Sequence, residues 1–241
     1  MQRIKATTLL FVILAFLPSL GRADATTVDP SRYSAPIKVA CVGDSITFGF
    51  GISGDRTTNP YPAQLANMLG AKWVVMNYGH NAATMLNSGD KPYQKQKEFQ
   101  DALQFNPDVV VILLGTNDSK PENWTHKDQF LADTKGLIAQ FQALPGKPLI
   151  YLAYPIAVGP APKFGINDAG VREEQPLLDQ AAHETGAIII DLHALTDGKW
   201  DLYNPDQVHP KLAGASLIAT GVFQALTGQP YAGALPPPAH P

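Results

Sequence analysis

Short apolar runs and longer amphipathic segments alternate along the chain. The runs are rich in Val, Ile and Leu, which suits strands that are buried on both faces. The pattern predicts strands at 37–42, 72–77, 109–114, 149–154 and 187–191. It predicts helices at 63–69, 93–105, 127–144, 171–185 and 211–226. Five strands separated by helices indicate an α/β fold in which a five-stranded parallel sheet is covered on both faces.

The first residues have the pattern of an export signal. Arg3 and Lys5 precede a largely apolar stretch at 8–20, and small residues follow at 23–25. We expect a signal peptide over 1–25, and therefore a secreted or periplasmic protein. A membrane-spanning helix needs about 20 apolar residues, and this stretch is shorter. We therefore expect no stable membrane insertion.

The remaining chain, 26–234, is interpreted as one domain, because the sequence shows no internal repeat and no sign of a second domain. Two irregular segments stand out. The segment 155–170 is rich in proline and glycine, which predicts a surface loop that could wall a pocket. The segment 235–241 is a proline-rich tail with nothing to pack.

Charge and cysteine content narrow the classes of function. Cleavage after Ala25 would remove three of the 18 basic and one of the 21 acidic residues, so the net charge would move from −3 to −5. Nucleic acid is therefore not an expected partner. Cys41 is the single cysteine and lies in an apolar run. We interpret it as a buried structural residue rather than a reactive thiol.

Candidate chemistry follows the predicted strands. Ser45 lies in GDSIT at 43–47, directly after the first strand, and GTND at 115–118 follows the third. Near the end of the chain, Asp206 and His209 are three residues apart before the last helix. Open parallel sheets bind ligands beyond the carboxyl ends of their strands. A serine, an imidazole and a carboxylate at that edge are the parts needed for nucleophilic acyl transfer.

These blocks, with NYGHNAAT at 77–84 and DQVHP at 206–210, stand in the order found in the SGNH, or GDSL-type, hydrolases. The chain resembles that family over nearly the whole predicted domain. The resemblance implies a flavodoxin-like three-layer α/β/α sandwich. It also implies that Ser45 is the nucleophile, His209 the general base and Asp206 the group that orients the imidazole. We expect neither a metal nor another cofactor.

The resemblance further implies an oxyanion hole. Its donors would be the N–H of Ser45, a backbone N–H of the second block and the side-chain amide of Asn117. The chain has Ala82 where the family usually has the donating glycine. A positive φ at Ala82 would be strained, so Gly79 is kept as an alternative donor.

Two other classes of protein are weighed against this interpretation. An α/β-hydrolase would carry Gly-x-Ser-x-Gly, but Thr47 occupies the second glycine position, and its acid and histidine would be far apart. A non-catalytic carbohydrate-binding protein built on a decayed esterase fold would explain Ala82. The intact Ser45, Asn117 and His209 argue against such decay.

The substrate is less well defined than the site. The second block and the residues after it resemble secreted members described as sialate O-acetylesterase-like or acetylxylan-esterase-like. We therefore expect a small-molecule or glycan ester, with acetyl as the acyl group. Lipase, lysophospholipase or thioesterase activity is the alternative. Trp124, Tyr154 and Trp200 are candidates for stacking on a sugar, although core packing is the commoner role.

Overall fold

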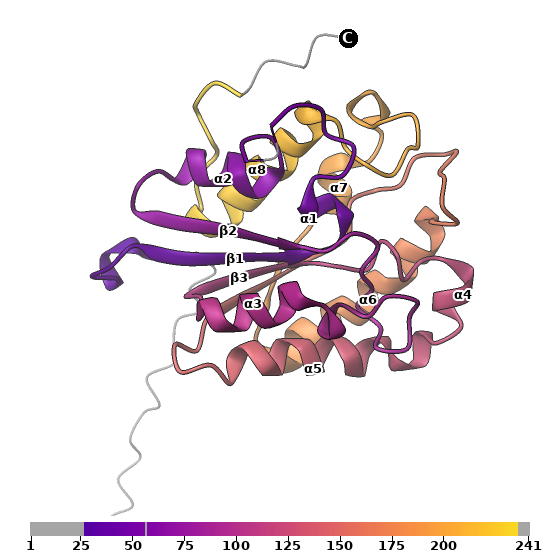
Figure 1. Cartoon of the computed structure of the whole chain (residues 1–241), viewed down its shortest axis with the longest axis horizontal. Coiled ribbons are helices and arrows are strands. Elements are labelled where there is room, and N and C mark those ends of the chain that lie inside the picture. Colours follow the sequence, from indigo (N-terminus) through magenta and orange to yellow (C-terminus); the bar gives the residue numbers. More distant parts are fainter. Residues whose placement is uncertain (1–26, 56, 236–241) are drawn as a thin grey trace, which may run out of the picture.

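The computed structural model describes residues 27–55 and 57–235 of the 241-residue chain. The predicted signal peptide at 1–25 lies outside these residues, as does the predicted tail except for Leu235. The domain between them is built on one sheet with helices on both faces (Figure 1).

The sheet has five parallel strands in the order β2-β1-β3-β4-β5. The strands are β1 (Ile37–Gly43), β2 (Trp73–Gly79), β3 (Val109–Leu113), β4 (Leu149–Ala153) and β5 (Ile188–Ile190). All five predicted strands and the parallel sheet are thus confirmed, and each strand ends within two residues of its expected position.

Helices form a layer on each face of the sheet (Figure 1). One layer contains α1 (Ser45–Phe48), α2 (Tyr61–Leu69), α7 (Leu192–Thr196) and α8 (Leu212–Thr227). The other contains α3 (Lys97–Phe105), α4 (Pro121–Trp124), α5 (Phe130–Gln142) and α6 (Asp168–Thr185). The three-layer α/β/α arrangement expected from the resemblance is confirmed. None of the helices within 27–55 and 57–235 is long and apolar enough to cross a membrane.

Alternate side chains of the central strands enter the two halves of the core. Val39 and Cys41 pack with the α2 and α8 side, whereas Ala40 and Val42 pack with the α3 and α5 side. Cys41 is fully buried, and burial raises the pKa of its thiol to about 12. Burial and this pKa suit the structural interpretation of Cys41.

Several predicted helix boundaries were wrong. The segment expected as one helix at 93–105 starts with a 3₁₀ turn (Tyr93–Lys95) before α3, and the segment expected at 127–144 starts with another (Lys127–Gln129) before α5. Helix α6 begins at Asp168 rather than 171, because the side chain of Asn167 accepts the N–H of Gly170 as an N-cap. The short helices α1, α4 and α7 were not predicted, since four or five residues show no periodicity. The remaining 3₁₀ turns are Pro30–Arg32 and Trp200–Leu202.

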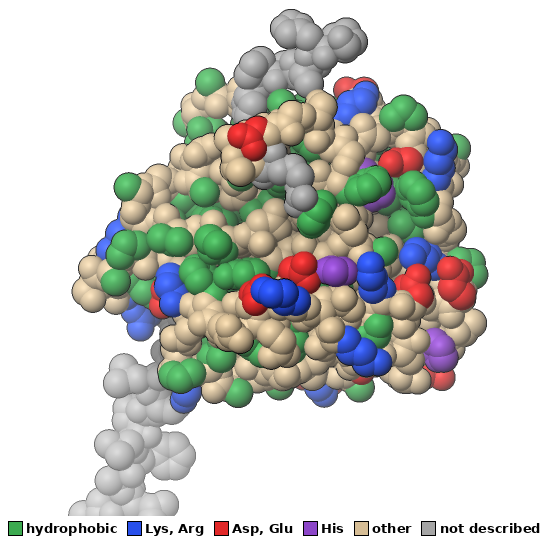
Figure 2. Space-filling view, viewed as in Figure 1, with side chains coloured by type: hydrophobic (Ala, Val, Ile, Leu, Met, Phe, Trp, Pro, Cys, Tyr) green, Lys and Arg blue, Asp and Glu red, His purple; other side chains and the backbone are tan. Residues whose placement is uncertain are grey.

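The strands that carry the motifs end at the same level. Gly43, the last residue of β1, is in register with Gly79 on one side and Leu113 on the other. The three segments that follow these residues therefore leave the sheet side by side. β2, the neighbour of β1, is an edge strand of the sheet, and apolar side chains lie along it in Figure 2; Val74 and Met76 are 40% and 42% exposed.

Candidate active site

Ser45 is placed by a tight strand-to-helix turn. It is the first residue of α1, and Asp44 caps that helix by accepting the N–H of Ile46 at 2.8 Å. The turn requires glycine at position 43, because a Cβ there would lie 2.0 Å from Thr47 Oγ1. As the first helical residue, Ser45 has an N–H with no acceptor within the helix.

Ser45, His209 and Asp206 are brought together as a hydrogen-bonded chain. Ser45 Oγ lies 2.9 Å from His209 Nε2, and His209 Nδ1 lies 2.9 Å from Asp206 Oδ2. The other oxygen of Asp206 accepts the N–H groups of Val208 and His209, each at 2.9 Å. Ser45 is 7% and His209 5% exposed, so the pair is shielded from bulk water.

The environment keeps Asp206 ionised. Partial burial alone would raise the pKa of this carboxyl group. Hydrogen bonds from the backbone N–H groups of His209 and Val208 and from the His209 ring outweigh that effect and hold the pKa of Asp206 below its usual value. An anionic Asp206 fixes His209 with its Nδ1 protonated and its Nε2 free to accept the proton of Ser45.

The second block places Ala82, not Gly79, beside Ser45. Ala82 has φ +65°, the strained left-handed conformation considered above, and it lines the same cavity as Ser45. No protein acceptor in the described part of the chain takes the N–H of Ala82. The N–H of Gly79, by contrast, donates to Asn77 Oδ1 at 2.9 Å. Gly79 is therefore not available as the alternative donor. Glycine is needed at this position because a Cβ would lie only 2.2 Å from the backbone nitrogen of Phe48.

The third block contributes the side chain of Asn117. Its Nδ2 donates to the carbonyl oxygen of Ala83 at 3.1 Å, which orients the amide, and the residue lines the cavity with Ser45 and Ala82. The fully buried carboxylate of Asp118, in the same block, accepts the N–H groups of Met85 and Leu86. Asp118 thus fastens the second block to the third.

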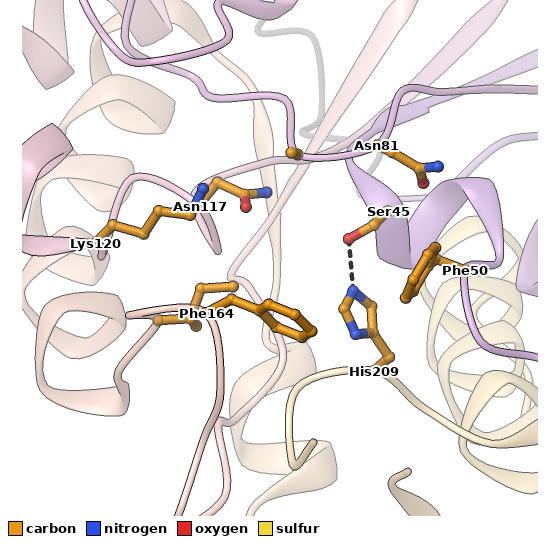
Figure 3. Close-up of a pocket in the computed structure, with 9 residues that line it drawn as sticks. Ser45, Phe50, Asn81, Asn117, Lys120, Phe164 and His209 are labelled. Carbon is orange, nitrogen blue, oxygen red and sulfur yellow. Dashed lines mark hydrogen bonds between the residues drawn. The ribbon is translucent and has the colours of Figure 1, made fainter. Parts of the chain in front are cut away.

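A cavity of about 190 Å³ opens directly in front of Ser45. Figure 3 shows His209 below Ser45, with Phe164 and Phe50 on either side of the imidazole and Asn117 across the cavity. The nine lining residues are Ser45, Phe50, Asn81, Ala82, Asn117, Lys120, Phe164, Ile166 and His209. The described residues hold no group of three or more His, Cys, Asp or Glu side chains suited to a metal ion.

The comparison with protein families agrees with this geometry. The model of the GDSL-like lipase/acylhydrolase family matches residues 41–217, which include every residue of the hydrogen-bonded chain. This chain belongs to that family. Lipases and acylhydrolases give this family its name.

One curated relative and two solved structures are similar to the chain. The GDSL-like chain is 42% identical over 217 residues to an acetylxylan esterase of Xylanibacter ruminicola, covering 82% of this chain and 44% of the relative. It therefore spans less than half of that protein's length. Two solved structures share its fold at low identity: a lipase/acylhydrolase from Enterococcus faecalis (20% identity, 80% of this chain and 98% of that one, TM-score 0.63) and a carbohydrate acetylesterase from Sinorhizobium meliloti (18%, 78% and 97%, TM-score 0.60).

Four lining residues were not found from the sequence. Phe50 and Phe164 are isolated aromatic residues in irregular segments, and nothing in their spacing marks them. Ile166 belongs to the 155–170 loop, which was expected to wall a pocket. Lys120 lies two residues after the GTND block, and this closeness to the motif was the available signal. It is 8% exposed, and its Nζ pairs with Asp90 Oδ2 at 3.0 Å.

The aromatic residues proposed for sugar stacking lie elsewhere. Trp124 packs against Phe130 and donates to Glu173 Oε2, Tyr154 bonds to Asp179, and Trp200 packs against Tyr203. None of the three lines the cavity. His80 of the second block does not line the cavity either; its Nδ1 lies 2.8 Å from Glu98 Oε2.

The irregular segment between β4 and α6 is fastened to the loop that carries Asp206. The N–H of Gly159 donates to the carbonyl of Gln207 at 2.9 Å, and that of Lys163 to the carbonyl of Asp206 at 3.0 Å. The side chain of Gln207 accepts the N–H of Ala161 at 2.9 Å. A small apolar cluster of Val158, Ile166, Val171 and Val208 lies beneath these contacts. The segment is therefore a fixed wall of the cavity.

Three buried carboxyl groups lie behind the motifs. Burial raises the pKa of Asp44 to about 6 and that of Asp118 to about 7, despite hydrogen bonds from backbone N–H groups. Burial, and then the neighbouring charges of Asp118 and Asp44, raise the pKa of Glu174 well above its usual value. Neither carboxyl oxygen of Glu174 has a hydrogen-bond partner among the described residues.

Proposed function

We propose that the chain is a serine esterase that removes short acyl groups, chiefly acetyl, from carbohydrate. The observation that carries this proposal is the Ser45–His209–Asp206 chain, with two successive contacts of 2.9 Å at the mouth of a small cavity. A serine hydroxyl is a weak nucleophile until a base takes its proton, and this geometry supplies the base and the group that orients it.

In the proposed reaction, Ser45 Oγ attacks the ester carbonyl while His209 Nε2 takes the hydroxyl proton. The imidazolium that forms is stabilised by the Asp206 carboxylate. His209 then returns the proton to the leaving alcohol, and an acyl group remains on Ser45. Water, deprotonated by the same histidine, releases the acid and regenerates the serine.

The negative charge that develops on the carbonyl oxygen needs donors already in place. Three groups around the cavity are suitable: the N–H of Ser45, the N–H of Ala82 and the side-chain amide of Asn117. Removing one such donor typically costs about 100- to 1000-fold in rate. We assign Ala82 this role because its backbone N–H is free, whereas that of Gly79 is bound.

Two observations support acetyl as the acyl group and carbohydrate as the alcohol. The cavity of about 190 Å³ is smaller than the roughly 300–1,000 Å³ of sites for drug-sized ligands. The 42% identical relative is named as an acetylxylan esterase. The signal peptide expected at 1–25 remains a prediction, as does the export that it implies. Export would suit an enzyme that acts on polymeric glycans.

Two measurements test the proposal. Acetate release should be followed from acetylated xylo-oligosaccharides and other acetylated glycans with the wild-type chain. Covalent labelling with diisopropyl fluorophosphate should place the phosphoryl adduct on the peptide that contains Ser45. A chain that releases no acid from any ester and is not labelled at Ser45 would be a binding protein on an esterase fold. Release from long-chain acyl lipids in place of acetyl esters would move the assignment to a lipase.

A further inference from the structure

We propose that Phe50, Phe164 and Asn81 form the binding site for the alcohol part of the ester, and that they select a hydroxylated ring such as a pyranose. This inference rests on the proposed function and names which residues would recognise the sugar. Phe50 and Phe164 lie outside all four motifs, and Asn81 belongs to the second block but was given no role there.

The position of this site follows from proton transfer. The leaving oxygen must receive its proton from His209 Nε2, so the alcohol has to lie beside the imidazole when the ester bond breaks. Phe50 and Phe164 flank that imidazole, with ring centroids 4.7 Å and 5.8 Å from it (Figure 3). The cavity holds a short acyl group, and a sugar ring attached to it would extend outward between these two phenyl rings.

The backbone conformation and the exposure of Phe164 are both energetically unfavourable. It is 57% exposed and has φ +65°, a conformation that bulky side chains rarely adopt. Strained backbone at such a residue persists where the surroundings fix it and is concentrated at ligand-binding sites. Here the contacts of Gly159, Ala161 and Lys163 with the Asp206–Gln207 loop hold the wall that carries Phe164. Exposed aromatic rings at a cavity mouth suit stacking on a flat apolar ring face.

Asn81 supplies the polar selectivity. The residue lines the cavity with Ser45, and its Oδ1 is a buried atom with no hydrogen-bond partner among the described residues. Leaving a buried acceptor unsatisfied is unfavourable, and a ring hydroxyl would satisfy it. A simple aryl or alkyl alcohol offers no such donor. Stacking therefore selects a ring, and Asn81 selects a ring that carries hydroxyl groups.

The test compares three acetate esters that differ only in the alcohol: methyl acetate, phenyl acetate and a mono-O-acetylated methyl xylopyranoside. Each kcat/KM is divided by that for methyl acetate. In Phe164→Asn, which tolerates the same φ but lacks the ring, we expect both ring-ester ratios to fall about tenfold. In Asn81→Ala we expect the xyloside ratio to fall by about tenfold and the phenyl ratio to stay within about twofold.

Two control variants complete the design. Phe164→Tyr keeps an aromatic ring and should retain the wild-type ratios. Met76→Ala removes an exposed apolar side chain of β2 outside the cavity and should change no rate. Unchanged ratios in both Phe164→Asn and Asn81→Ala would overturn the site. So would an equal loss on all three esters, which would mean that Phe164 only positions His209. Failure of the wild-type chain on every ester would instead overturn the proposed function.

Discussion

The carboxylate of Asp118 accepts the N–H of Leu86 at 2.8 Å, and its second oxygen accepts that of Met85 at 2.9 Å. A buried carboxyl group in the third block thereby fixes the loop of the second. The spacing between the Ala82 N–H and the Asn117 amide is set by this connection rather than by either loop alone. Groups held in this way before the substrate binds need no rearrangement when the oxyanion forms.

Loss of Ser45 should remove the nucleophile without unfolding the domain. We expect Ser45→Ala to reduce hydrolysis of p-nitrophenyl acetate to near background, and His209→Ala to be comparably severe. Asp206→Asn should be milder if the acid mainly orients the histidine. His183→Ala, at an exposed histidine outside the cavity, is the control. Activity of Ser45→Ala within about tenfold of wild type would contradict the assignment.

Ala82→Gly should stabilise the protein. The alanine is held at φ +65°, and glycine adopts that conformation without the Cβ clash. We expect the free energy of unfolding to rise by about 1 kcal/mol, with kcat retained because the N–H is retained. Urea denaturation gives the first quantity. Lys147→Gly, at φ +44° in a remote turn, should show similar relief of strain. A destabilised Ala82→Gly variant would show that the alanine side chain itself contributes to the loop.

Asn117→Ala should affect the transition state more than the bound substrate. We expect kcat to fall about 100- to 1000-fold while KM changes by less than about threefold. Because the amide also bonds to the Ala83 carbonyl, the melting temperature must be measured in parallel. Asn87→Ala removes an amide that bonds to Asp133 outside the cavity and should keep kcat. An unchanged kcat in Asn117→Ala would mean that other groups stabilise the oxyanion.

Glu174 should make the protein less stable as the pH rises. Its pKa is raised in the folded state, so the folded chain retains a proton that the unfolded chain loses above about pH 4.5. Stability is then greatest at low pH and declines toward the folded pKa. We expect Glu174→Met to raise the melting temperature more at pH 8 than at pH 5. Equal shifts at both pH values would contradict this.

The neighbouring Glu173 provides the matched control for that pH dependence. It is exposed, and hydrogen bonds from Trp124 and then Lys127 lower its pKa. The sign is therefore opposite: any stabilisation that it provides is present above its usual pKa and is lost as the pH falls. Glu173→Gln should accordingly leave the slope between pH 5 and pH 8 unchanged.

The dependence of kcat/KM on the length of the acyl chain should distinguish an esterase from a lipase. The cavity is small, about 190 Å³, and the buried side chain of Ile166, which is 4% exposed, forms part of its wall. We expect kcat/KM to fall from p-nitrophenyl acetate to butyrate and again to octanoate. A steady rise toward octanoate would indicate an acyl site that extends beyond this cavity.

The sequence was most informative where the chain is regular. Strand β3 is fully buried, and its run of apolar residues predicted it almost to the residue. The motif residues Ser45, Asn117 and Asp206 follow strands or precede a helix, so the topology alone brings them to one edge. Phe50 and Phe164 escaped detection because their positions depend on loop conformations that long-range contacts impose.

The backbone dihedral angles of individual residues could not be predicted from the sequence either. The strain at Ala82 could be stated only as a condition, because a positive φ arises from the hydrogen bonds of its loop to other segments. Likewise, no pattern marks Glu174 as a buried carboxyl group that has no hydrogen-bond partner among the described residues. It lies in an amphipathic helix at a position where the helix happens to face the loop of Gly115, whose added Cβ would lie 2.1 Å from Glu174 Oε2.

The contacts between Lys163 and Asp206 have a consequence for how the enzyme admits its substrate. A segment whose N–H is bonded to the carbonyl of the acid residue cannot swing outward without pulling on that residue. Such a movement would draw Asp206 away from His209 and leave the imidazole without its orienting partner. The hydrogen bond therefore couples the position of the entrance segment to that of Asp206, and the observed place of the segment is the one in which Asp206 contacts His209.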